Sequence, residues 1–418
     1  MDVPESACMR CIGGRIVVKP TQSDLSGKRV LVTGGTGFIG GRLVEKLVLE
    51  CQADVRVLVR NFARASRIAR FSIEMVHGDV TSPGDVEQAV AGCEVVFHCA
   101  YGNRGSKEMQ RLVNVEGTRN VLEAALHARV ERVVYLSTLM VYGATPDGDL
   151  DETTPRRYSG TVYADSKLDA EKIAFEYAKK HGLSVTILQP TVVYGPFAPV
   201  WTVDVLQRLK TEQMILVNGG NGLCNAIYVD DAVNAMLLAA VKEEAVGEAF
   251  LISDGQPVTW RDFYGRHARM LGTAEMVSMS ATELLKAYHA RKPRKTKGIL
   301  KETLNILREE PLVRRRLLST SEAATIGKIG RSLVPKQIQQ SLKRRIKGNS
   351  KTNHQRTAPE EGKSMRPMIP PVVRFYAAKT RVRIDKAKRL LGYQPVFDFE
   401  SGMRLTEQWA RWANLLGE

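Results

Sequence analysis

A glycine-rich turn near the start of the chain places the strongest constraint on its fold. Residues 33–40 read Thr-Gly-Gly-Thr-Gly-Phe-Ile-Gly, and they separate an apolar strand-like run at 30–33 from an amphipathic helical pattern. The N-terminus of such a helix offers free N–H groups and positive dipole charge. The turn therefore predicts a pyrophosphate site, in which Gly34 permits the tight turn, Gly37 the approach to phosphate, and Gly40 close packing of helix and strand.

A second signature lies further along the chain, where Tyr163 precedes Lys167 by four residues. On a helix this spacing puts both side chains on one face. Between the two signatures, a buried-looking apolar run at 133–137 ends in the hydroxyls of Ser137 and Thr138. Tyrosine, lysine and hydroxyl groups in this order suit proton transfer to or from a carbonyl or alcohol oxygen.

With these motifs the chain resembles the extended short-chain dehydrogenase/reductase family, from about residue 28 to the C-terminus apart from one insertion. The resemblance is to the NAD-dependent epimerase/dehydratase type, with 3β-hydroxysteroid dehydrogenase-like features near the C-terminus. Further matching motifs stand at residues 78–80, 97–100, 114–120, 189–190, 194–196, 228–231 and 391–395.

Both the resemblance and the alternation of strand and helix patterns predict an α/β fold, a Rossmann-type doubly wound parallel sheet. Strands are expected at 30–33, 55–59, 95–99, 133–137 and 185–189, with returns to the sheet around 226–228 and 249–253, and the last helix is expected to stop at Gly392. The expected parts are an N-terminal extension (1–27), a dinucleotide-binding domain (28–195, its sheet completed by about 226–255), a smaller substrate lobe (196–225, 256–285 and 367–418) and a basic insertion (286–366).

The resemblance also implies roles for the site residues. Tyr163 is expected to be the general acid or base, and Thr138, with its neighbour Ser137, to hold the substrate oxygen. A free tyrosine titrates near 10, so Lys167 and a cationic nicotinamide ring are expected to lower its pKa. Asn114 is expected to help position the lysine.

The cofactor is expected to be NADP rather than NAD. The strand at 55–59 lacks the terminal acidic residue that NAD-specific relatives carry, and Arg60, with Arg64 behind it, is placed to meet a 2′-phosphate. An arginine after a strand is also a common solvated residue, so both cofactors stay open. The cofactor-binding residues implied by the resemblance are Gly34, Gly37, Phe38, Ile39, Gly40, Arg60, Asp79, Val80, Ala100, Asn114, Tyr163, Lys167 and Pro190.

The reaction is expected to be oxidation, reduction or epimerisation at a carbinol or carbonyl carbon. Relatives that remove water from a sugar place an Asp-Glu pair directly after the catalytic threonine, where this chain has Leu139 and Met140. Dehydration is therefore disfavoured. A catalytically inactive NADP-sensing protein is a further alternative, although such proteins typically lose the tyrosine or lysine.

Two substrate classes remain open: a nucleotide-sugar or lipid-linked sugar, and a sterol or small ketone. Cys224 stands where nucleotide-sugar relatives usually carry a diphosphate-binding arginine, whereas Arg374 lies near a second such arginine. The first class is the expected substrate, and the 3β-hydroxysteroid dehydrogenase-like C-terminal features keep the second class as the alternative. Substrate contacts are expected from Tyr101, Thr138, Tyr194, Cys224 and Arg374.

Charge is concentrated in the insertion. The chain has a formal net charge of +16, and residues 286–366 carry 22 Lys and Arg against 6 Asp and Glu, so the remainder is neutral. Nucleic-acid binding by the catalytic body is therefore not expected. Apolar residues every fourth position over 334–346 predict a basic amphipathic helix on an anionic membrane; a solvated insertion or a docking site for an acidic partner remains open.

Six cysteines show no disulfide framework, which favours a reducing, cytoplasmic setting. If the basic insertion binds a membrane, the protein would lie at the inner face of that membrane. Cys8 and Cys11 lack partners for a zinc site, and no metal is expected. No apolar run reaches the length that spans a bilayer. The resemblance implies a homodimer.

Overall fold

The computed structural model describes residues 24–103, 105–143, 145, 147–272, 276–290 and 367–417. All of these residues except His289 and Ala290 belong to one compact unit, built from the chain up to Tyr288 and from Lys363 onward. The predicted helix at 334–346 and the pair Cys8 and Cys11 lie outside the described residues. No described helix is both long and apolar enough to cross a membrane.

A seven-stranded sheet forms the centre of the unit, in the order β12-β7-β5-β4-β1-β2-β3. Every neighbouring pair is parallel, which confirms the predicted doubly wound Rossmann fold. The strands are β1 (Arg29–Thr33), β2 (Asp54–Val59), β3 (Glu74–His77), β4 (Val95–His98), β5 (Arg132–Leu136), β7 (Val185–Pro190) and β12 (Ala249–Ile252).

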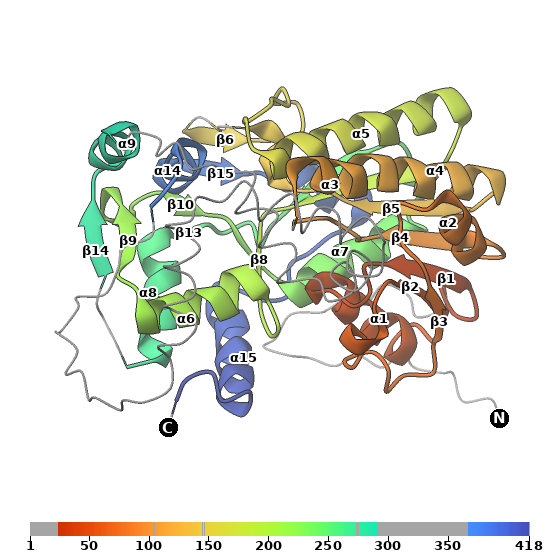
Figure 1. Ribbon diagram of the computed structural model, residues 1–418, viewed down its shortest axis with the longest axis horizontal. Coiled ribbons are helices and arrows are strands. Elements are labelled where there is room, and N and C mark those ends of the chain that lie inside the picture. Colours follow the sequence, from red (N-terminus) through yellow and green to blue (C-terminus); the bar gives the residue numbers. More distant parts are fainter. Residues whose placement is uncertain are drawn as a thin grey trace, which may run out of the picture. The chain divides into compact units, whose positions relative to one another are not determined.

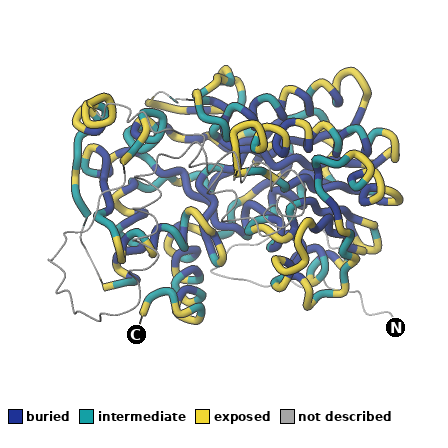
Figure 2. The backbone as a smooth tube through the Cα atoms, viewed as in Figure 1, coloured by how far each residue is buried: buried dark blue, intermediate teal, exposed yellow. Residues whose placement is uncertain are grey.

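Helices cover both faces of this sheet (Figure 1). Side chains alternate between faces along each strand: Val30 and Val32 pack in the cluster that includes α1 and α7, whereas Leu31 packs in the cluster that includes α2, α4 and α5. Figure 2 shows the burial concentrated along the strands. The helices are α1 (Phe38–Leu49), α2 (Pro83–Val90), α3 (Lys107–Arg111), α4 (Gly117–His127), α5 (Val162–His181) and α7 (Val229–Val241), with the short turns η1 (Phe62–Arg64), η2 (Leu112–Glu116), η3 (Leu139–Tyr142) and η6 (Glu243–Ala245).

Pairs of short strands and further helices make up the rest. The pairs are β6 (Gly148–Leu150) with β15 (Thr380–Val382), β8 (Val192–Tyr194) with β11 (Ala226–Tyr228), β9 (Met214–Val217) with β14 (Met276–Met279), and β10 (Leu223–Cys224) with β13 (Val258–Thr259). The helical elements are η4 (Pro199–Val203), α6 (Asp204–Thr211), η5 (Asn218–Gly220), α8 (Trp260–Met270), α9 (Ala281–Ala290), α14 (Pro370–Ala377), η7 (Ala387–Leu391) and α15 (Phe399–Trp412).

Two details of the expected topology need correction. The strand predicted at 226–228 does not join the main sheet, because β11 pairs with β8 in a separate two-stranded sheet. Gly392 ends the helical turn η7 in a left-handed conformation, as expected, but η7 is not the last helical element. The chain then continues into α15, whose apolar face completes the core with Met403 and Ala410.

Two adjacent aspartates at the start of α7 hold distant segments together. Asp230 forms a two-pronged ion pair with Arg42 of α1 (2.7 and 2.8 Å). Asp231 is fully buried and accepts hydrogen bonds from the backbone N–H groups of Val396 and Phe397, each at 3.0 Å. The segment that follows the insertion is therefore anchored to the sheet domain by main-chain hydrogen bonds.

A nearby carboxyl group makes stability depend on pH. Burial, with Asp231 and Asp398 as neighbours, raises the pKa of Asp254 to about 7, against roughly 3.9 in an unfolded chain. The folded state thus binds the proton more tightly, and stability falls as pH rises from about 4 to about 7. Asp254→Asn keeps an acceptor for the Gln256 N–H and removes the charge. The melting temperature of the variant relative to wild type should rise by about 2–4 °C between pH 5 and pH 8; a difference that stays constant with pH would contradict this assignment.

Candidate active site

The turn between β1 and α1 leaves no room for a side chain at Gly34, Gly35 or Gly40. Gly34 has φ +72°, and a Cβ there would lie 2.7 Å from the backbone nitrogen of Ala100. A Cβ on Gly40 would lie 2.4 Å from the Gly34 carbonyl oxygen. Gly40 thus packs against the turn itself, and Gly35, which sequence reasoning did not single out, provides the close approach to β2 at Val57.

This turn fits the phosphates of a dinucleotide. Helix α1 begins after Gly37 without a side-chain cap, so its first N–H groups are not occupied by a side chain. Gly37 is exposed and Phe38 and Ile39 are half-buried beside it. The uncapped helix end and the glycine cradle together can bind an anion.

The ends of β1 and β4 are joined by side-chain hydrogen bonds. Thr33 Oγ1 lies 2.8 Å from His98 Nδ1 and accepts from the N–H of Ala100 at 3.3 Å. His98 Nε2 lies 3.0 Å from the hydroxyl of Thr118 on α4. Burial lowers the pKa of His98 to about 3, so the ring is a neutral hydrogen-bonding bridge between these elements. His98 was not singled out from the sequence, although the motif at residues 97–100 contains it.

The residues predicted to meet the adenosine half cluster at the ends of β2 and β3. The Arg60 side chain is 66% exposed, and its Nη1 lies 3.4 Å from Asp79 Oδ2. Asp79 also accepts from the N–H and the hydroxyl of Thr81. Val80 is buried against Gly117 of α4. An exposed cation and a carboxylate therefore stand together where a ribose would lie.

Tyr163 and Thr138 are brought together, as the sequence predicts. The Thr138 side chain acts directly on the Tyr163 phenol, and the ring of Tyr101 lies edge-on to Tyr163 with centroids 6.1 Å apart. Burial raises the pKa of Tyr163 to about 12, although Thr138 opposes this. The phenol is therefore protonated at neutral pH.

Lys167 lies one helical turn further along α5, and its ammonium is buried. Its Nζ donates to the carbonyl oxygen of Leu136 at 2.7 Å and lies 4.7 Å from the centre of the Tyr135 ring. Burial lowers the pKa of Lys167 to about 8. Lys167 is not among the groups that shift the pKa of Tyr163, because its ammonium is directed to the end of β5. The expected lowering of the tyrosine pKa by the lysine is thus not seen.

Asn114 joins the segment after β4 to α5. It lies in η2, a π-helical turn, and its Nδ2 donates to Ser166 Oγ at 2.9 Å and to the carbonyl of Gly102 at 3.1 Å. Its Oδ1 accepts from the N–H of Gly102 at 2.7 Å. The amide thus holds the residue that precedes Lys167, as a positioning role requires.

Three predicted contact residues lie in the interior instead of facing an open site. Pro190 is a buried residue of β7. Tyr194 is buried and donates its hydroxyl to the Phe399 carbonyl. Cys224 is 0% exposed and belongs to the main core cluster, so its thiol packs against apolar side chains.

Arg374 does line a cavity. This small space, about 70 Å³, lies beside the turn η3 that follows Thr138. Its walls are mixed, with apolar side chains from Met140, Pro371 and Phe375 and polar ones from Thr145, Tyr158, Ser159 and Arg374.

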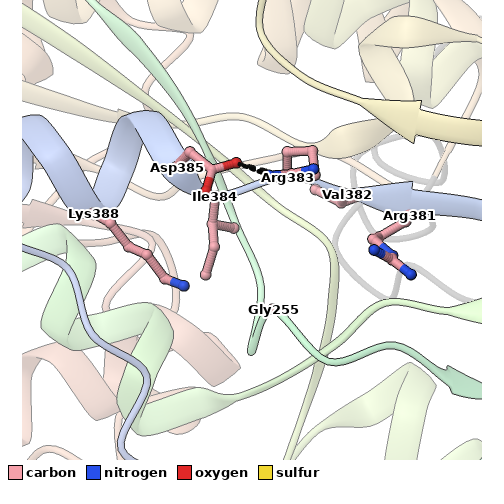
Figure 3. A pocket seen from close by; sticks show the side chains of 7 residues that line it. All are labelled: Gly255, Arg381, Val382, Arg383, Ile384, Asp385 and Lys388. Atoms are coloured by element: carbon pink, nitrogen blue, oxygen red, sulfur yellow. Dashed lines mark hydrogen bonds and ion pairs between the residues drawn. The ribbon is translucent and has the colours of Figure 1, made fainter.

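A larger cavity of about 220 Å³ contains none of the predicted residues. Figure 3 shows the side chains that line it between β15 and η7, with Arg383 paired to Asp385. Lys388 and Gly255 lie on its other sides. No sequence motif pointed to this cavity.

Comparisons with known proteins agree with this geometry. A model of the NAD dependent epimerase/dehydratase family matches residues 30–253, more than half of the chain. A 4-hydroxy-2-methyl-3-oxo-4-farnesyl-3,4-dihydroquinoline-1-oxide ketoreductase of Stigmatella aurantiaca is 30% identical over 241 residues, 56% of this chain and 71% of the relative. A 3-beta-hydroxysteroid dehydrogenase of Mycolicibacterium neoaurum is 32% identical over 252 residues, 56% of this chain and 68% of the relative.

Solved structures share the fold. DesIV, a dTDP-glucose 4,6-dehydratase of Streptomyces venezuelae whose crystal structure contains NAD, superposes with a TM-score of 0.62 at 21% identity, over 92% of this chain and 98% of that one. The family match, the relatives and the parallel sheet confirm the resemblance inferred from the motifs. The chain belongs to the NAD dependent epimerase/dehydratase family.

Proposed function

We propose that the protein is an NAD(P)-dependent oxidoreductase that interconverts a ketone and a secondary alcohol, with Tyr163 as the proton-transferring group. The observation that carries this proposal is the meeting of the Thr138 and Tyr163 side chains, in which Thr138 opposes the burial-driven rise of the Tyr163 pKa, next to the buried ammonium of Lys167. Two hydroxyls that meet in this way can both hold one substrate oxygen.

Each residue has a distinct task in this reaction. A nicotinamide dinucleotide, when bound, supplies or accepts the hydride. Tyr163 donates its phenolic proton to the carbonyl oxygen, and Thr138 holds that oxygen by a hydrogen bond. Lys167 adds positive charge close to the oxygen that becomes negative. Asn114 fixes the helix that carries both groups through Ser166.

The state of Tyr163 favours reduction at neutral pH. Because its pKa is raised to about 12, Tyr163 is present as the protonated phenol that reduction requires, and the phenolate that would act as a base is scarce at neutral pH. Oxidation of an alcohol needs the phenolate and should therefore gain rate as the pH rises. A ketoreductase among the similar proteins supports the same direction.

The substrate is proposed to be a largely apolar ketone. Met140, Pro371 and Phe375 supply apolar walls beside the Thr138 turn. The Cys224 position, where nucleotide-sugar relatives usually carry a phosphate-binding arginine, belongs to the core. The names of two similar proteins, a farnesylated quinoline ketoreductase and a steroid dehydrogenase, describe apolar ring substrates.

One observation favours a second candidate, epimerisation of a nucleotide-sugar. Arg374 lines the cavity next to η3, and among the described residues no acidic side chain forms an ion pair with it. An arginine in this position can bind a diphosphate. A screen of sterols, small ketones and nucleotide-sugars, followed by nicotinamide absorbance and product stereochemistry, separates the two, because epimerisation shows no net change in cofactor.

Replacement of the tyrosine tests the chemistry. Tyr163→Phe removes the proton donor and should lower kcat for ketone reduction about 10²- to 10⁴-fold, with cofactor affinity retained. Tyr177→Phe is the matched control, since Tyr177 lies on the same helix and contacts Glu123 away from the site. Unchanged turnover in Tyr163→Phe on the true substrate would refute the assignment.

Two glycine-to-alanine substitutions, one in the turn and one control, test the dinucleotide turn. Gly34→Ala places a Cβ against the Ala100 backbone at positive φ, so it should destabilise the fold by about 1–3 kcal/mol and abolish cofactor binding measured by nicotinamide fluorescence. Gly84→Ala in α2 has open space around it and should stabilise the protein by about 0.5–1 kcal/mol. Normal cofactor binding by Gly34→Ala would remove the turn from the site.

The preference for NADP is tested at Arg60. If its exposed guanidinium binds a 2′-phosphate, Arg60→Ala should raise KM for NADPH about tenfold and leave KM for NADH unchanged. Arg119→Ala, an exposed arginine on α4, serves as control. A wild-type enzyme with a clear preference for NAD would rule out this role for Arg60.

A further inference from the structure

A buried carboxylate lies one turn beyond Lys167 on α5. The Glu171 side chain is 1% exposed, and residues four apart on a helix face one another. Nε2 of Gln189 donates to both carboxylate oxygens, at 2.9 and 3.0 Å. Nε of Arg156 lies 2.9 Å from Oε2. The reaction proposed above assigns no task to Glu171.

The contacts of Glu171 fit the ionised form. The amide of Gln189 donates to both carboxylate oxygens and the guanidinium of Arg156 forms an ion pair with one of them, whereas a protonated carboxyl group would need an acceptor for its own hydrogen. Burial raises the pKa of Glu171, and the amide of Gln189 and the positive charges of Arg156 and Lys167 oppose that rise. A buried carboxylate with an arginine and an amide bound to it is a satisfied anion.

The other titratable groups that face Lys167 are neutral. Cys99, just after β4, has its pKa raised by burial to about 12, and His98 of β4 has its pKa lowered to about 3. Tyr135 of β5, whose ring lies under the ammonium, has its pKa raised well above 10. Among the described groups that act on Lys167, Glu171 is thus the one that carries charge at neutral pH.

We propose that Glu171 is the counter-ion of Lys167, a positioning residue that keeps the lysine protonated in its buried place. Arg156 forms an ion pair with Glu171 at 2.9 Å. Glu171 lies one helical turn beyond Lys167 on α5, and its charge favours the protonated lysine. A catalytic role for Lys167 rests on the function proposed above. The pairing of Glu171 with Lys167 does not depend on that function, because it is a property of the folded chain.

The same anion is connected to the turn that carries Thr138. The Tyr142 hydroxyl donates to Oε1 of Gln189 at 2.9 Å, and Tyr142 is the last residue of η3, which begins directly after Thr138. The Arg156 guanidinium lies over the rings of Tyr142 and Phe175, at 5.8 and 5.1 Å. One set of polar contacts therefore joins η3, β7 and α5.

The pairing predicts how Lys167 titrates. In protein with ¹³Cε-labelled lysine, with neither cofactor nor substrate added, the Lys167 signal is identified by its loss in Lys167→Arg. Its pKa in wild type should lie near 8. Glu171→Gln should lower that pKa by about one unit or more. Glu176→Gln, at an exposed position of the same helix that pairs with Lys180, should leave it unchanged.

Two outcomes would overturn the proposal: an unchanged Lys167 pKa in Glu171→Gln, or an equal shift in Glu176→Gln. Glu171→Asp, which retains the charge, should keep the Lys167 pKa closer to wild type than glutamine does. If Glu171→Gln does not fold, wild type with ¹³Cδ-labelled glutamate decides, because a protonated Glu171 at pH 7 refutes the pairing. These measurements need no turnover, so they can succeed even if Tyr163→Phe disproves the proposed reaction.

Discussion

The contact between the turn after β1 and the backbone after β4 is the constraint on which the site depends. At Gly34 a side chain would overlap the Ala100 nitrogen, so the two strand ends approach as closely as main chains permit. Thr33 and His98 hold this approach with hydrogen bonds. Because β5 pairs with β4 in the same parallel sheet, the distance from the dinucleotide turn to Thr138 is set by strand spacing alone. The position of Thr138 at the end of β5 is therefore set by backbone pairing, whereas Tyr163 and Lys167 are positioned by the packing of α5 against the sheet.

Electrostatics at the site follow from burial rather than from charge pairing alone. The same desolvation that holds the Tyr163 phenol protonated also pushes Lys167 toward losing its proton. Burial thus favours the neutral form of both residues on this helix, although a lysine with a pKa of about 8 still carries its proton at pH 7. A buried anion on the same helix is the kind of group that can prevent this for the lysine without acting on the tyrosine, and Glu171 has that location.

Much of the fold followed from periodicity, because apolar runs in buried parallel strands are hard to mistake. The expected strands differ from β1, β2, β4, β5 and β7 by a residue at their ends. β3 was missed because its residues are only partly buried and its sequence carries two polar side chains. The pairing of β11 with β8 could not be read from three residues, since register there depends on contacts distant in sequence.

The residues of the site could be predicted from its motifs, whereas the directions in which their side chains point could not. Spacing placed Tyr163 and Lys167 on one helical face, but which oxygen the ammonium meets depends on β5 and its Leu136 carbonyl. The burial of Cys224 likewise depends on packing that no local pattern reveals. Glu171 follows Lys167 at helical spacing, a signal present in the sequence, yet a charged residue at that spacing is most often on a surface.

Asp231 and the segment it anchors have a consequence for synthesis of the chain. The backbone N–H groups of Val396 and Phe397 bind a carboxylate on α7, and α15 buries Met403 in the core. During translation these partners emerge only after the whole 286–366 stretch has been made, on the order of ten seconds after the residues they cover. Until then the nascent sheet domain carries an uncovered apolar face and a buried carboxylate without its donors. Transiently exposed apolar surface favours aggregation, and the insertion lengthens the interval during which this surface stays uncovered.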